Sequence, residues 1–171
     1  KEITIPNTVT KLGNCCFGCC SYLTTIELNE GLLEIGEYCF QYCYSLKEIN
    51  IPNTVTKFGN DCFKYCESLK EINIPNTVTK IRKSCFYYCY NLTKIELNEG
   101  LLEIDEYCFY NCYSLKEIII PNTVTKIGND CFDYCTNLTT IELNEGLLEI
   151  GEYCFSYCQS LKEITIGNTV T

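Results

Sequence analysis

The sequence predicts an α/β repeat solenoid, and three observations support this prediction. First, a leucine recurs with a fixed period of 23 residues and no insertion, at Leu23, Leu46, Leu69, Leu92, Leu115, Leu138 and Leu161. Second, apolar and polar residues alternate after most of these leucines, which is typical of a half-buried strand. Third, every repeat contains two cysteines spaced i, i+4. A fixed period of this size is the mark of a stacked repeat protein.

The first element of each repeat has the pattern Leu-x-x-Ile-x-Ile/Leu. In one copy, Ile72 and Ile74 alternate with Glu71 and Asn73, so we expect a short strand with one buried face. A turn follows in one of two forms, Pro-Asn-Thr (as at 52–54) or Asn-Glu-Gly (as at 29–31). Proline ends a strand ladder, and glycine supplies a positive φ where a turn requires one.

The second element is Val-Thr-Lys-Ile or Leu-Leu-Glu-Ile, which predicts another short extended segment with inward residues such as Val55 and Phe58. A glycine usually follows. Arg82 and Asp105 occupy the same column, so a positive φ is not obligatory there. The third element is Cys-Phe-x-x-Cys, and its spacing predicts one short helical turn with both cysteines on one face.

Equivalent residues of stacked strands lie ~4.8 Å apart, so each column of the repeat becomes a ladder. One column consists of Lys11, Glu34, Lys57, Lys80, Glu103, Lys126 and Glu149. Neighbours carry opposite charges at five of the six steps, and each such pair contributes roughly 0.2–1 kcal/mol. A second column has one like-charged step, between Glu48 and Glu71. The order of the two turn types therefore keeps the number of like-charged neighbours in these ladders small.

Fourteen of the sixteen cysteines form two columns, represented by Cys62 and Cys66. Metal binding or a redox store is one interpretation, but zinc sites need ligands that converge from separate elements. The other interpretation, which we favour, is two buried columns of free thiols that pack as small apolar side chains. Cys15 and Cys19 lie outside both columns and are the candidate reactive or crosslinking thiols, although chance drift explains them equally well.

Two further patterns are candidate sites. One tyrosine per repeat forms a candidate interaction strip, which consists of Tyr42, Tyr65, Tyr88, Tyr134 and Tyr157. Tyrosines suit interfaces, but the rings could instead stack on one another and shield the turn. Asn91 and Asn137 begin Asn-Leu-Thr sequons in one column, so they are candidate glycosylation sites if the chain is secreted, or chance matches.

Composition and charge exclude several function classes. The net charge of −9 argues against nucleic acid as a partner. No apolar run approaches the length of a transmembrane helix, so no membrane insertion is predicted. Histidine is absent, and a near-perfect repeat offers no unique catalytic constellation. We therefore predict a protein that is not an enzyme, has no cofactor and has no metal site.

The consensus, L-x-x-I-x-I-P-N-T-V-T-K-I-G-N-x-C-F-x-Y-C-x-S, resembles the BspA-like (Treponema pallidum-type) leucine-rich repeat family over the whole chain. The column of Cys62 departs from the family pattern, which more often has alanine, and is similar to the cysteine-rich versions in parasitic amoebae. The resemblance implies a right-handed leucine-rich-repeat solenoid, with a parallel β ladder on one side and short helical turns on another. It also implies a cell-surface or extracellular location, frequently with adhesion or host-protein binding, and no fixed ligand residues.

We expect residues 1–171 to form a single solenoid of about seven repeats, uncapped at both ends. The predicted function is a non-enzymatic protein-interaction or adhesion module for a protein ligand that the sequence does not name. The alternative is a structural protein whose uncapped ends associate head to tail into a filament. A cytoplasmic location also stays open, because no signal peptide is present.

Overall fold

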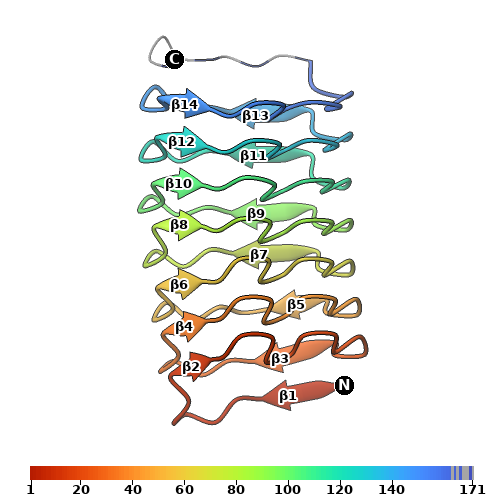
Figure 1. Cartoon of the computed structure of the whole chain (residues 1–171), viewed down its shortest axis with the longest axis vertical. Helices are drawn as coiled ribbons and strands as arrows, with labels where there is room; N and C mark the ends of the chain where they lie inside the picture. Colours follow the sequence, from red (N-terminus) through yellow and green to blue (C-terminus); the bar gives the residue numbers. More distant parts are fainter. Residues whose placement is uncertain (163, 165, 167–169, 171) are drawn as a thin grey trace.

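The structure is a computed structural model that describes residues 1–162, 164, 166 and 170. Short strands alternate along the chain and form two stacks that follow the long axis of the molecule (Figure 1). The Leu-x-x-Ile element forms β1 (Glu2–Thr4), β3 (Thr25–Glu27), β5 (Glu48–Ile49), β7 (Glu71–Asn73), β9 (Lys94–Glu96), β11 (Glu117–Ile119) and β13 (Thr140–Glu142). The second element forms β2 (Lys11–Leu12), β4 (Glu34–Ile35), β6 (Lys57–Phe58), β8 (Lys80–Ile81), β10 (Glu103–Ile104), β12 (Lys126–Ile127) and β14 (Glu149–Ile150).

The predicted parallel solenoid is confirmed, with about six turns of roughly 23 residues. Strands pair in parallel with equivalent positions opposed, as in Ile72 with Ile95 and Ile104 with Ile127. The odd-numbered stack is interrupted between β5 and β7 and between β9 and β11, and the even-numbered stack between β6 and β8. The β5–β7 and β6–β8 steps are those where charge columns place like charges side by side, Glu48 with Glu71 and Lys57 with Lys80. The third interruption has no like-charged step to explain it.

The predicted helical turn is wrong, because the part of the chain that the structure describes contains no helix. The Cys-Phe-x-x-Cys element is instead a run of turns. The Cys66 N–H donates to the Phe63 carbonyl three residues back (3.1 Å), whereas the Phe63 and Tyr65 N–H groups donate to the next repeat, at 2.9 and 2.8 Å. A helix would satisfy these N–H groups internally. Alternate groups here bond across repeats, so the turns form a third ladder.

These turns place bulky residues in the left-handed backbone region. Tyr65 has a φ of 60° and Asp61 a φ of 53°, and the same two columns hold every other described non-glycine residue with positive φ. No described glycine has a positive φ, so Gly31 does not play the role predicted for its turn. Glycine is required elsewhere for close approach, since a Cβ on Gly59 would lie 2.2 Å from the backbone nitrogen of Glu37.

The core is built from ladders of identical side chains. The rings of Phe40, Phe63, Phe86 and Phe109 stack nearly parallel, with successive centroids 5.3, 5.5 and 5.5 Å apart. The second cysteine column flanks this stack. The Cys112 thiol, for example, donates to the Phe86 carbonyl at 3.3 Å. Most cysteines of both columns are therefore fully buried, as predicted, and all are free thiols.

A buried asparagine joins each Asn-Glu-Gly repeat to the repeat before it. The Asn98 side-chain amide donates to the carbonyls of Pro75 (2.8 Å) and Val78 (3.0 Å), and its oxygen accepts the Gly100 N–H at 2.7 Å. The same bonds recur at Asn29 and Asn144. In all three cases both carbonyls belong to a Pro-Asn-Thr repeat, so this asparagine fastens each Asn-Glu-Gly repeat to the Pro-Asn-Thr repeat on its N-terminal side.

Candidate interaction surface

The predicted tyrosine strip exists as a ladder of stacked rings on the turn side of the solenoid. Ring centroids lie 5.0 Å apart between Tyr42 and Tyr65, 5.0 Å between Tyr65 and Tyr88, and 4.4 Å between Tyr134 and Tyr157. Each of these residues has a positive φ. The strip is partly exposed along its length, and Tyr157 is the most open member at 59%. The rings thus shield one another and also face solvent.

Tyr110 closes the gap that Asn111 leaves in the strip. Its ring centroid is 5.7 Å from both Tyr88 and Tyr134. Tyr110 also stacks on Tyr87 at 4.8 Å. The sequence-based prediction missed both residues because they occupy the neighbouring column. Their one signal was that Tyr87 and Tyr110 replace charged or small residues in successive repeats.

A lysine lies against the aromatic cluster formed by Tyr87, Tyr88 and Tyr110. The Lys64 ammonium is 4.7 Å from the centroid of Tyr87 and 2.9 Å from the Asp61 carboxylate. A lysine over an aromatic face is attracted by the ring quadrupole, by about 0.5–1 kcal/mol at exposed sites. Burial raises the pKa of the Tyr87 hydroxyl well above its usual range, and neighbouring tyrosines raise it further. The Tyr87 hydroxyl is therefore neutral at physiological pH.

Cys15 and Cys19 are exposed and occupy the outer positions of their turn. Both have positive φ, 55° and 61°, and their N–H groups donate to the carbonyls of Glu37 (2.8 Å) and Gln41 (2.7 Å). They stand where later repeats carry tyrosine, aspartate, serine or asparagine. Their reactivity stays a prediction. By contrast, burial raises the pKa of the Cys39 thiol to about 12.

The sequon asparagines have a structural role. The Asn91 side-chain amide donates to the Glu67 carbonyl at 2.7 Å, and that of Asn137 to the Tyr113 carbonyl at 2.9 Å. Both bonds join neighbouring repeats. Asn91 is exposed and Asn137 is half-buried. Glycosylation of either residue stays a prediction.

The charge ladder on the even-numbered strands forms ion pairs at three of the five steps where opposite charges were predicted to be neighbours. Lys11 bonds to Glu34 at 2.9 Å, Lys80 to Glu103 at 2.6 Å and Lys126 to Glu149 at 2.7 Å. The Lys80 hydrogen bond lowers the pKa of the Glu103 carboxyl.

The described residues include no group of three or more His, Cys, Asp or Glu side chains placed to hold a metal ion. Nor do they form any helix with the length and apolar character needed to cross a bilayer. What the surface does offer is stacked aromatic rings, amide groups and paired charges. These are the elements of a recognition surface.

The family comparison agrees with this architecture. A family model described as BspA type leucine rich repeat region matches with six copies, over residues 1–116 and 56–171. The chain belongs to this family. Curated proteins provide no match to the sequence.

Solved structures of leucine-rich repeat proteins share the fold. A Bacteroides ovatus leucine-rich repeat protein is 33% identical, with a TM-score of 0.93 over 99% of this chain and 44% of its own. A leucine rich cell surface protein from Faecalibacterium prausnitzii is 28% identical, with a TM-score of 0.59 over 82% of this chain and 46% of its own. The T. pallidum leucine-rich repeat protein is 23% identical, with a TM-score of 0.63 over 99% and 70%, and shows the fold alone. The chain spans less than half of the first two proteins.

Proposed function

We propose that this leucine-rich-repeat solenoid is a non-enzymatic protein-interaction module of a cell-surface or extracellular protein, and that it adheres to a protein ligand through the tyrosine strip. The observation that carries the proposal is the partly exposed series of ring contacts from Tyr42 to Tyr157, in which Tyr110 bridges Tyr88 and Tyr134. The relative from F. prausnitzii, described as a cell surface protein, supports the location.

The geometry of the strip suits binding. Stacked rings lose little conformational freedom when a partner docks, since their neighbours already hold them in place. Tyrosine offers a large apolar face and a hydroxyl at its tip, and it is enriched at binding hot spots. Tyr134 and Tyr157 are the most exposed strip members, at 37% and 59%. Both rings offer an open face to a partner, so these two residues are varied in the test.

The test is biosensor binding of the purified chain to immobilised fibronectin, laminin and collagen. We expect binding to at least one of these proteins and a loss of at least tenfold in the double variant Tyr134→Ser and Tyr157→Ser. The matched control is Tyr22→Ser, because Tyr22 is 84% exposed but lies off the strip. Binding to none of the three proteins, or equal binding by the double variant, would contradict the proposal.

The same preparation tests the filament alternative. Light scattering and electron microscopy of the purified chain would show rods one solenoid wide if head-to-tail association were the principal activity. We expect a monomer at the concentrations used for binding. Rods that form in the absence of any ligand would favour the structural role over the interaction module.

A further inference from the structure

The charge ladder on the even-numbered strands leaves one lysine without an ion pair. Lys57 follows Glu34 in this ladder, but Glu34 is bonded to Lys11. The next ladder member is Lys80, which carries the same charge and bonds to Glu103. Within residues 1–162 and the few described beyond them, Lys57 forms no ion pair. The step between two Pro-Asn-Thr repeats therefore carries an excess positive charge.

Arg82 adds a second unpaired cation beside this step. It occupies the column that holds Gly59 in the preceding repeat and Asp105 in the following one. Asp105 is bonded to Lys80 at 3.0 Å, so it is not available to the arginine. No ion pair of Arg82 occurs in the described part of the chain. Two cations from neighbouring repeats are thus left over at one place.

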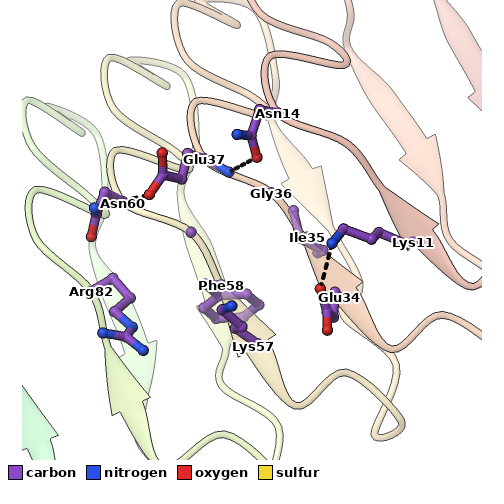
Figure 2. Close-up of a pocket in the computed structure, with 11 residues that line it drawn as sticks. Lys11, Asn14, Glu34, Ile35, Gly36, Glu37, Lys57, Phe58, Asn60 and Arg82 are labelled. Atoms are coloured by element: carbon purple, nitrogen blue, oxygen red, sulfur yellow. Dashed lines mark hydrogen bonds and ion pairs between the residues drawn. The ribbon is translucent and has the colours of Figure 1, made fainter.

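Both cations border one pocket of about 390 Å³ (Figure 2). Figure 2 shows Arg82 and Lys57 on one side of this hollow, with Asn60 and Glu37 on another. Gly36 and Gly59 occupy the same column as Arg82 and also line the pocket. A Cβ at either glycine would meet the backbone of the preceding repeat, so these glycines let neighbouring repeats pack closely. The side chains of Lys57 and Arg82 supply the unpaired positive charge of the pocket.

We propose that this pocket binds the carboxylate of an acidic residue in a partner polypeptide. A guanidinium presents a planar fork of donors that matches a carboxylate, and Lys57 adds a second positive charge. The ladder lysines Lys11, Lys80 and Lys126 are each neutralised by a glutamate. The pocket is therefore a local positive site on a chain whose net charge is −9.

The carboxylates in the pocket favour a peptide over a polyanion. Glu34 and Glu37 line the same hollow as Lys57 and Arg82. A sulfated glycan or nucleic acid would bring many negative charges against these two glutamates. A peptide brings one carboxylate for the cations. Glu34 and Glu37 already accept bonds from Lys11 and Asn60, but each carboxylate has further acceptor positions for a backbone N–H of the peptide. This mixed pattern is the electrostatic complement of an extended acidic peptide segment.

The site is independent of the tyrosine strip. Lys57 belongs to β6, whereas the strip lies on the turn side of the solenoid. The peptide pocket therefore goes beyond the proposed adhesion function, and either can fail alone. A variant at Tyr134 and Tyr157 should bind the acidic peptide normally.

The experiment follows amide chemical shifts of the whole ¹⁵N-labelled chain during titration with acetyl-Gly-Ser-Glu-Ser-Gly-amide. We expect saturable shifts at Gly59, Asn60 and Arg82, and none with the peptide in which glutamine replaces glutamate. Lys57→Ala and Arg82→Gln should each weaken binding at least fivefold. The matched control is Lys126→Ala, because Lys126 has the same ladder position but is paired with Glu149. That variant should bind within twofold of the parent.

Three results would overturn the proposal. The glutamine peptide could give the same shifts, which would show that the carboxylate is not recognised. Lys57→Ala and Arg82→Gln could leave the binding unchanged while the spectra show a folded chain. A heparin tetrasaccharide could bind the same amides more tightly than the peptide, which would assign the pocket to a glycan.

Discussion

The inner and outer faces of the same turn follow different rules. Phe86 points inward and is fully buried, whereas Tyr88, two residues later, lies in the partly exposed strip. The phenylalanine column is unbroken from Phe17 to Phe155, but the tyrosine column is interrupted by Cys19 and Asn111. An interior side chain packs against its copies in the two neighbouring repeats and has no solvent to replace them, so a change in one repeat leaves a void beside both neighbours. An outer side chain that loses a neighbouring side chain can contact water in its place.

The same contrast applies to polar groups. Interior thiols are held neutral by burial, which raises the pKa of Cys39, Cys43 and Cys154 to about 12. Outer charges such as Lys80 stay ionised and find partners in neighbouring repeats. The identical interior side chains therefore define the solenoid. The outer positions vary from repeat to repeat, and this variation gives the chain a surface of its own.

The largest expected effect is a loss of stability at alkaline pH. Unfolded thiols ionise near pH 8.5, whereas burial raises the folded pKa of Cys43 to about 12 and also raises the pKa of Cys62 and Cys66 well above the usual range. Stability is therefore full below about pH 8.5 and falls as the pH rises toward 12, because the unfolded state releases protons that the folded state retains. Urea midpoints measured from pH 7 to 11 should fall continuously. The urea midpoint of the double variant Cys15→Ser and Cys19→Ser should fall with pH in parallel with that of the parent. A midpoint that does not depend on pH would contradict the presence of buried neutral thiols.

The next effect separates the two faces of the turn directly. Phe86→Ala should reduce the free energy of unfolding by about 3–5 kcal/mol, because the cavity removes contacts with Phe63 and Phe109. Tyr88→Ala should cost less, about 1–2 kcal/mol, since it loses ring contacts with Tyr65, Tyr87, Tyr90 and Tyr110 but no buried core volume. Urea denaturation monitored by circular dichroism measures both. Equal costs would mean that the tyrosine strip is part of the core.

The strands and their register could be predicted from the sequence. Ile72 and Ile95 occupy equivalent repeat positions, and a 23-residue period without insertions leaves one way to stack them. The burial of Cys62 followed from the same logic, because every copy of its column is identical. The ion pair between Lys80 and Glu103 also followed once the strand spacing was assumed.

The turns could not be predicted in this way. The i, i+4 spacing of Cys62 and Cys66 fits one helical turn, but it fits equally a chain that bonds across repeats at every second residue. Tyr65 with positive φ has no sequence signal, since tyrosine avoids that region without tertiary support. The roles of Asn98 and of Arg82 depend on side-chain geometry in the preceding and following repeats. Such relations appear only when neighbouring repeats are placed in three dimensions.

The smallest expected effect tests the outer ladder alone. Glu103→Gln should cost about 0.2–1 kcal/mol, because it removes one ion pair of Lys80 while Asp105 keeps the other at 3.0 Å. Lys80 lowers the pKa of Glu103, so this stabilisation is present at neutral pH and is lost as the pH falls through the folded pKa. The difference from the parent should therefore shrink in acid, and also in 1 M salt through screening. Glu117→Gln is the control, because Glu117 forms no ion pair among the described residues. If Glu103→Gln lowered the free energy of unfolding more than Phe86→Ala does, the outer charge ladder rather than the interior would hold the repeats in register.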